Sequence, residues 1–114
     1  MADTWIRLLG PPRIEPPDTA PAAPQQRGTP PAQPRGRKAW AVLAYLALSP
    51  AGVSRARTAA LLFPDAADPL GALRWNLSEL RRVLGGPAIT GDPLRLELAP
   101  PWRCDVLELG SAAA

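Results

Sequence analysis

The pattern in residues 68–85 constrains the fold of this 114-residue chain more than any other stretch. Four leucines there are separated by four, three and four residues: Leu73, Leu77, Leu80 and Leu84. At 3.6 residues per turn, this spacing places all four on one side of a helix, which we expect to face a core. Asp68 is a good N-cap, Pro69 suits the first helical position, and Gly85 suits the C′ site. The sequence thus predicts the helix and both of its ends.

The opposite side of this helix carries an indole and guanidinium groups. A helical wheel places there Gly71, Trp75, Ser78 and Arg82, with Glu79 beside them and Arg74 and Arg81 at the border. One interpretation is a solvated basic face with a single tryptophan. The other is a recognition helix, in which arginines contact phosphates and guanine edges while the indole packs into the groove. The segments before and after the helix are needed to decide.

Two further helices are expected before it. Residues 39–48 are apolar on nearly every side and rich in helix formers, which predicts a buried helix. The basic residues just before it oppose the helix dipole, so phosphate contact is a plausible role for them: Arg35, Arg37 and Lys38. Ser54 should cap a second helix over residues 55–63, which Pro64 stops. The short link of residues 64–67 leads directly into the helix at residues 68–85. These last two helices are joined by a few residues and the second is amphipathic and basic, which predicts a helix-turn-helix.

In the predicted helix over residues 55–63, we expect three residues to turn inward: Ala59, Leu62 and Phe63. Three others should face outward: Arg55, Arg57 and Thr58. After residue 85, residues 88–98 contain a turn and a two-residue alternation, which predicts a β-hairpin with its leucines inward and Arg95 and Glu97 outward. A hairpin directly after a helix-turn-helix is the layout of a wing. Residues 102–109 predict a last strand.

The remaining segments predict the domain organisation. Residues 1–15 should supply short N-terminal strands, since residues 4–9 and 13–15 are β-rich runs around a Gly-Pro-Pro turn. Residues 16–36 are rich in Pro, Ala, Gln and Thr, which predicts a flexible loop, with a ligand for an SH3-like partner as a less favoured alternative. We expect residues 37–109 to form the core of one small domain and residues 110–114 a frayed or truncated tail.

Amino-acid composition limits the classes of function that we expect for this chain. Residues 27–82 contain nine basic and three acidic residues, whereas the whole chain has a net charge of only +3, so a polyanionic partner for the middle of the chain is favoured. The absence of histidine and of phosphate-cradling glycine motifs argues against an enzyme, a metal site or a cofactor. The single cysteine, Cys104, should be buried and suits a reducing compartment. With no membrane-length apolar run and no signal peptide, we expect a cytoplasmic protein.

Six segments, taken in order, resemble a known family. They are residues 6–14, 36–48, 53–55, 61–65, 73–85 and 104–106. Together they resemble the N-terminal DNA-binding domain of the SARP/AfsR family, bacterial transcriptional activators with an OmpR/PhoB-type winged helix. The resemblance covers most of residues 4–109, except for the proline-rich loop. It implies a third helix in the major groove of duplex DNA, a wing near the minor groove, and tandem or dimeric binding on direct repeats.

The resemblance also implies which residues contact DNA. These are Arg55, Arg57, Arg74, Trp75, Ser78, Arg81, Arg82 and Arg95, while the four leucines stay in the core. Three features depart from the family. Residues 16–34 replace part of its N-terminal sheet, Glu79 lies on the predicted outer face, and the activation domain that usually follows is absent. The chain is therefore expected to be a fragment, or a binder that depends on RNA polymerase contacts or on a missing activation domain.

The sequence as a whole predicts an α+β winged helix-turn-helix with three helices, a C-terminal β-hairpin wing and short N-terminal strands. The predicted function is sequence-preferring binding of double-stranded DNA in transcription regulation. The alternative is a protein-interaction module of the same fold, in which Trp75 is the anchor and the arginines form the rim.

Overall fold

The computed structural model describes residues 3–16 and 32–113. In that part of the chain the fold is α+β, with four α-helices and two small sheets. The chain divides into two compact units: the sheet unit, residues 1–33 with 98–114, and the helical unit, residues 34–97. Each is described by itself. Most of the proline-rich loop, and with it the prediction of flexibility, lies outside the described residues.

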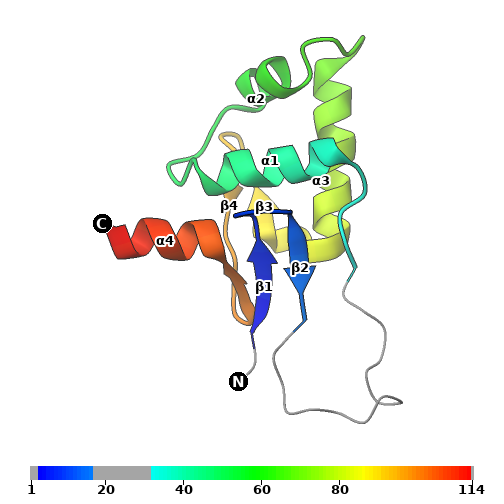
Figure 1. The fold of residues 1–114 in the computed structure, drawn as a ribbon. Helices are drawn as coiled ribbons and strands as arrows, with labels where there is room; N and C mark the ends of the chain where they lie inside the picture. The colour runs from blue at the N-terminus through cyan, green and yellow to red at the C-terminus, as the bar shows by residue number, and fades with distance from the viewer. Residues whose placement is uncertain (1–2, 17–31, 114) are drawn as a thin grey trace. The chain divides into compact units, whose positions relative to one another are not determined.

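The sheet unit contains three strands in the order β2-β1-β5 (Figure 1). β1 (Thr4–Arg7) pairs with β2 (Arg13–Glu15) in the antiparallel and with β5 (Trp102–Cys104) in the parallel direction. Ile6 lies opposite both Ile14 and Cys104, and all three side chains are buried. The predicted N-terminal strands and the burial of Cys104 are therefore confirmed. Burial raises the pKa of the Cys104 thiol.

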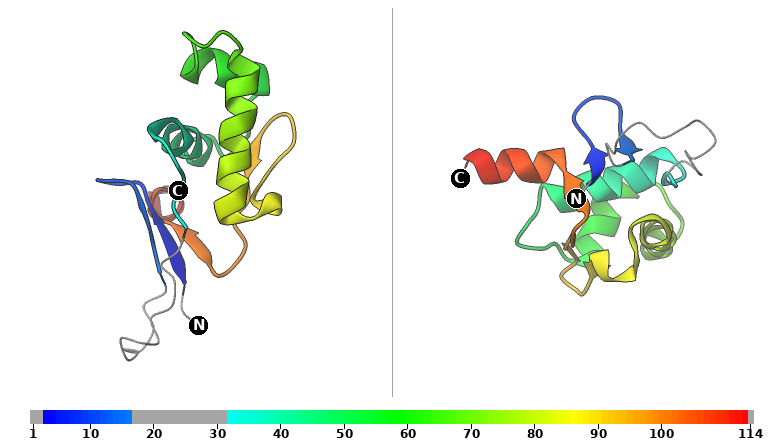
Figure 2. Two further views of the ribbon diagram at one scale, coloured as in Figure 1. Left: turned by 90° about the vertical axis from the view of Figure 1, so that its right-hand side faces the viewer. Right: turned by 90° about the horizontal axis from the view of Figure 1, so that it is seen from below.

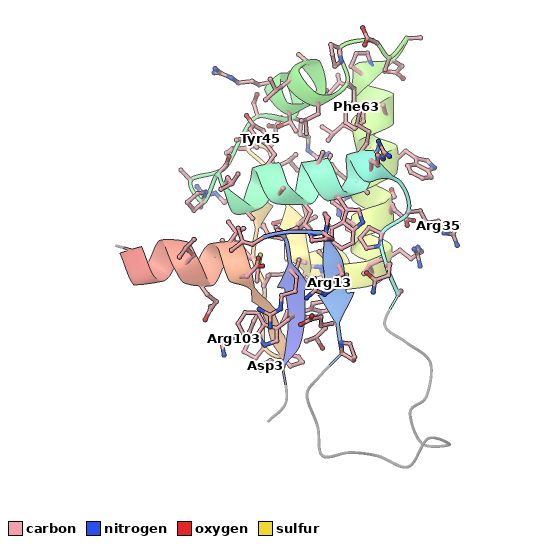
Figure 3. All side chains as sticks on the ribbon, viewed as in Figure 1. Asp3, Arg13, Arg35, Tyr45, Phe63 and Arg103 are labelled. Carbon is pink, nitrogen blue, oxygen red and sulfur yellow. The ribbon has the colours of Figure 1, made fainter. Side chains whose placement is uncertain are left out.

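The other side of β1 carries Trp5 between two guanidinium groups. The guanidinium carbon of Arg7 lies 4.3 Å from the centre of the Trp5 ring, and that of Arg103 lies 4.6 Å from it. The Arg7 Nε donates to Glu15 at 2.8 Å, while Arg103 pairs with Asp3 and Glu108 on the neighbouring elements (Figure 3). The arginines of this sheet are thus neutralised by carboxylates of the same unit.

The prediction of a strand over residues 102–109 is wrong beyond Cys104. Helix α4 (Asp105–Ala113) follows directly, so the predicted tail of residues 110–114 is also helical as far as Ala113. The Asp105 carboxylate accepts from the main-chain N–H of Val106 at 2.7 Å, and it also accepts from Leu8 and Leu9 after β1. An acidic residue at the helix start and the good helix formers that follow outweigh the short apolar alternation.

The helical unit contains α1 (Arg37–Ala47), α2 (Arg55–Leu62) and α3 (Pro69–Leu84), each in contact with the other two (Figures 1 and 2). A short 3-10 helix, η2 (Gly86–Ala88), then leads into strands β3 (Ile89–Thr90) and β4 (Arg95–Leu96). The predicted order of three helices followed by a hairpin is confirmed. None of the helices in the described ranges is long and apolar enough to cross a bilayer.

The leucine side of α3 faces the core, as the spacing predicts. Leu73 is 1 % exposed, Leu77 and Leu80 are fully buried, and Leu84 is 7 % exposed. The Asp68 carboxylate accepts from the main-chain N–H of Gly71 at 3.0 Å, which confirms the N-cap. At the other end Gly85 adopts a φ of 97°, a conformation that favours glycine. Both predicted ends of the helix are correct.

Helix α2 differs from the prediction in one residue of its outward-facing set. Ser54 caps it through its hydroxyl, which accepts from the Arg57 N–H at 3.0 Å, and the helix ends before Phe63. Thr58, however, was expected to face outward and is fully buried. Its hydroxyl donates to the Ser54 carbonyl at 2.7 Å, so the buried polar group is satisfied within its own helix. Because that bond is local, the threonine packs as a small apolar residue.

The hairpin is short and fastened to the helices. Ile89 pairs with Leu96 and Thr90 with Arg95, and an isolated bridge joins Val53, just before α2, to Leu94. Leu94 is fully buried, while Arg95 and Glu97 are exposed as predicted. At the turn Gly91 has a φ of 86°, and a Cβ there would lie 2.9 Å from the Pro93 carbonyl oxygen. The turn therefore requires glycine at this position.

Candidate nucleic-acid interface

Three of the predicted contact residues lie exposed on α3. Trp75 is 59 % exposed, and Arg74 and Ser78 are exposed beside it. Within the described ranges, the Arg74 guanidinium forms no hydrogen bond or ion pair. Since the leucines hold the other side of the same helix in the core, this part of α3 presents a flat aromatic group and a cation directly to solvent.

The helical wheel placed Glu79 on the outer face of α3, but in the structure it does not lie there. Its carboxylate is only 7 % exposed and accepts two hydrogen bonds from Arg82, from Nε at 3.0 Å and from Nη2 at 2.7 Å. It also accepts from the main-chain N–H of Arg35 at 2.6 Å. The hydrogen bond from Arg82 lowers the pKa of Glu79 to about 2, although burial opposes the shift and the Arg35 N–H adds to it.

The segment before α1 explains why the wheel failed for Glu79. A wheel places residues relative to the leucines of one helix, but it contains no information about what covers the sides. Pro34 is buried and Arg35 bonds to Glu79, so residues 34–35 cover this flank of α3. A carboxylate that faces main-chain N–H groups and a guanidinium is stable there. Glu79 thus belongs to the interior of the unit and does not place a negative charge on its surface.

Arg82 and Arg81 have structural contacts as well as exposed parts. The Arg82 side chain remains 42 % exposed while it pairs with Glu79. Arg81 is half-buried, and its Nε donates to the Ile89 carbonyl at 3.1 Å, which ties the start of the hairpin to α3. Of these two predicted contacts, Arg82 has the more exposed side chain, whereas Arg81 holds β3 against α3.

The two arginines of α2 also differ in whether their guanidinium groups are used in contacts within the unit. The Arg55 Nε donates to the Gly91 carbonyl at 3.0 Å, and its main-chain N–H donates to the Asp92 carboxylate at 3.1 Å. Arg55 therefore holds the hairpin turn against the start of α2. Arg57 is exposed, and nothing in the described part of the chain pairs with its guanidinium. Of these two arginines, Arg57 is therefore the one whose guanidinium is available to an external anion.

Arg95 is the one predicted contact on the hairpin itself. It is exposed on β4, opposite Thr90. Its aliphatic stem lies 3.2 Å from where a Cβ on Gly52 would stand, so the stem packs over that glycine. The Nε of its guanidinium lies 3.3 Å from the same position, so the polar end of Arg95 begins directly above Gly52.

Sequence reasoning gave the basic cluster before α1 only a general role in phosphate contact. Arg37 is exposed in the first turn, whereas the Lys38 ammonium donates to the Leu62 carbonyl at 2.6 Å, at the end of α2. Lys38 also lies 5.5 Å from the centre of the Phe63 ring, so it joins α1 to α2 although it remains exposed. Arg35 is exposed in the segment that leads into α1 (Figure 3). Nothing in the sequence pattern around Arg35 indicates that its main-chain N–H forms a hydrogen bond with α3.

In sum, the helical unit presents an exposed group of Arg74, Trp75 and Ser78, with Arg82 further along the same helix. The described residues contain no group of three potential metal ligands among His, Cys, Asp and Glu. Comparison of the chain with family models, curated proteins and solved structures found no match.

Proposed function

We propose that the helical unit is a winged helix that binds double-stranded DNA with sequence preference, as part of a bacterial transcriptional regulator of the SARP/AfsR kind. In this proposal α3 lies in the major groove and the β3–β4 hairpin near the adjacent minor groove. The order of elements supports it, since α1, α2 and α3 are followed directly by an antiparallel hairpin. The Val53–Leu94 bridge adds support because it ties that hairpin to the segment between α1 and α2.

One observation carries the proposal. On α3 the indole of Trp75 and the guanidinium of Arg74 are exposed on a helix whose leucines are buried. Large exposed aromatic groups beside unpaired cations suit a partner that offers both anions and flat apolar surface. The major groove of DNA offers phosphates at its edges and base edges with thymine methyl groups on its floor. An α-helix fits into it.

The proposed roles follow from the chemistry of each group. Arg74 is suited to a bidentate contact with the O6 and N7 of guanine, and the Ser78 hydroxyl to either kind of base edge. Trp75 would pack against base edges or sugar. Arg57 and Arg82 are suited to phosphates, and Arg95 to the backbone beside the hairpin. Arg55 and Arg81 would act mainly by holding the hairpin in place, because their Nε atoms donate to main-chain carbonyls.

A protein partner anchored by Trp75 is the second candidate, because an indole that is 59 % exposed also suits the centre of a protein interface. The two candidates differ in their response to salt. With about three backbone contacts, from Arg57, Arg82 and Arg95, the logarithm of the DNA association constant should fall against the logarithm of the salt concentration with a slope of about −2.7. A tryptophan-centred protein interface should respond much more weakly.

The test is fluorescence anisotropy of the purified chain with a labelled pool of random duplexes, at several salt concentrations. Arg74→Ala and Trp75→Ala should weaken or redirect binding, while Arg13→Ala should not. Arg13 is a matched control because it is an arginine of the sheet unit, half-exposed and paired with Glu15. Equal affinity for all four proteins would reject α3 as the DNA-reading helix. Selection from the same pool should recover a motif, and a repeat spaced by about one helical turn would indicate tandem binding.

A further inference from the structure

A three-residue cluster joins α3 to the segment before α1. The Glu79 carboxylate accepts from the Arg82 guanidinium through both of its oxygens and from the main-chain N–H of Arg35 through one of them. Glu79 is 7 % exposed, whereas the Arg82 side chain is 42 % exposed and Arg35 is exposed as well. The negative charge is therefore inside and the two positive charges are outside.

The cluster has a net charge of +1, and its surface is wholly cationic. Arg82 neutralises Glu79 directly, which is why the pKa of Glu79 falls to about 2. A single buried carboxylate thus fixes the backbone position of one arginine and the side-chain direction of another. Without it, the Arg82 guanidinium and the Arg35 main chain would have no common attachment, and the Arg82 side chain would lose more conformational freedom when it binds an anion.

The position of the cluster on α3 is suited to the edge of a groove. Trp75 and Arg82 lie on the same stripe of the helix, seven residues or about 10 Å apart along its axis. The major groove is about 12 Å wide, with phosphates along both edges. If the first half of α3 contacts base edges, as the proposed function requires, the cluster lies near one of the phosphate rows.

We infer that Arg35 and Arg82, held together by Glu79, form one phosphate-binding site at the carboxyl-terminal half of α3. This inference rests on the proposed function and adds a residue outside the helix-turn-helix, Arg35, to the DNA interface. It assigns Glu79 the role of a positioning residue that does not itself contact DNA. If Glu79 acted on DNA only by charge repulsion, removal of its negative charge would strengthen binding. If it positions the arginines, removal of that charge should weaken binding.

The experiment uses the intact chain, a labelled random duplex pool and anisotropy at several salt concentrations. Arg35→Ala removes one phosphate contact, so it should reduce the salt slope by about one and the affinity by about fivefold at about 0.15 M salt, for all sequences alike. The main-chain hydrogen bond to Glu79 is kept in this variant, so the fold should be unaffected. Glu79→Gln raises the net charge by one yet should also lower the affinity, because the guanidinium of Arg82 is no longer fixed.

The outcomes separate the two proposals. Arg13→Ala gives the effect of losing one positive charge from the sheet unit, and Arg74→Ala reports on the proposed function. If Arg35→Ala matches Arg13→Ala while Arg74→Ala still weakens binding, the inference fails and the proposed function stands. Tighter binding by Glu79→Gln would also overturn the inference, since it would show plain repulsion. If no duplex is bound, or if Arg74→Ala has no effect, both proposals fail.

Discussion

Replacement of Leu77 by alanine tests the orientation of α3, on which the interface depends. Leu77 is fully buried and lies in the middle of the helix, with Leu73 and Leu80 buried on either side of it. The substitution removes three carbon atoms from the core, which costs about 2.4 kcal/mol of transfer free energy. A cavity between neighbours that cannot fully collapse adds to this, so the free energy of unfolding should fall by about 3–5 kcal/mol. That is a large part of the stability of a small domain.

Urea denaturation followed by circular dichroism measures this loss. Two residues of the same helix serve as controls, because Leu70 is 44 % exposed and Trp75 is 59 % exposed. Alanine at either position should cost no more than about 1 kcal/mol, with an unchanged dependence on urea concentration. A loss below about 1 kcal/mol for Leu77→Ala, or a larger loss for Trp75→Ala, would mean that α3 is turned the other way and that its arginines are not presented as described.

Three further predictions concern other contacts. The folded pKa of Glu79 is lowered from 4.5 to about 2, so Glu79 stabilises the chain above about pH 5 and this contribution is lost as the pH falls towards 2. In urea denaturation, the free energy of unfolding should therefore differ less between pH 7 and pH 3 in Glu79→Gln than in the unchanged chain. Equal differences in the two proteins would contradict the ion pair. Asp68→Ala should cost about 1 kcal/mol through loss of the N-cap, whereas Asp65→Ala, in the turn before it, should change the melting temperature little; equal melting temperatures would argue against the cap. Thr58→Val keeps the shape of the buried side chain but leaves a main-chain carbonyl without its second donor, so thermal unfolding should show a loss of about 1 kcal/mol, and a more stable variant would contradict the hydrogen bond.

The features that sequence predicted well are those set by local chemistry. The leucine spacing of α3 and its capping residues, Asp68 and Gly85, act within one or two turns of the helix. The same holds for the Ser54 cap of α2 and for the alternation of Leu94 and Arg95 in the hairpin. In each case the physical cause lies within a few residues of its effect, so it is present in the sequence itself.

The features that sequence missed depend on what covers a given side chain. Glu79 and Thr58 both looked like surface residues on a helical wheel, yet Glu79 is covered by residues 34–35 and Thr58 satisfies its hydroxyl within α2. The family resemblance implied a DNA contact for Arg55, and in the structure its Nε donates to the hairpin turn. The contacts of Glu79 and Arg55 involve segments 44 and 36 residues away in the chain, which no local pattern records, whereas the Thr58 hydroxyl bonds to a carbonyl only four residues earlier.

The start of α4 shows a different limit. Residues 102–109 contain apolar residues at a spacing that fits a short strand, and they also contain good helix formers. The structure uses both properties in turn, since β5 ends at Cys104 and the helix begins at Asp105. The Asp105 carboxylate accepts hydrogen bonds from the main-chain N–H groups of Leu8 and Leu9, which follow β1, and from that of Val106. Pairing with a strand about 100 residues earlier therefore decides where the strand ends.

The packing around α3 bears on the choice between a DNA and a protein partner. The leucine side is buried in the core and the flank at Glu79 is covered, so the exposed surface of the helix is concentrated around Arg74 and Trp75, with Arg82 beyond them. An apolar protein surface that buried Trp75 would also have to desolvate the Arg74 guanidinium, which has no partner in the residues that the structure describes. Desolvation of an unpaired charge costs several kcal/mol, comparable to what burial of an indole contributes. A partner that supplies anions beside flat apolar groups avoids this cost, and duplex DNA has both along the whole length of its groove.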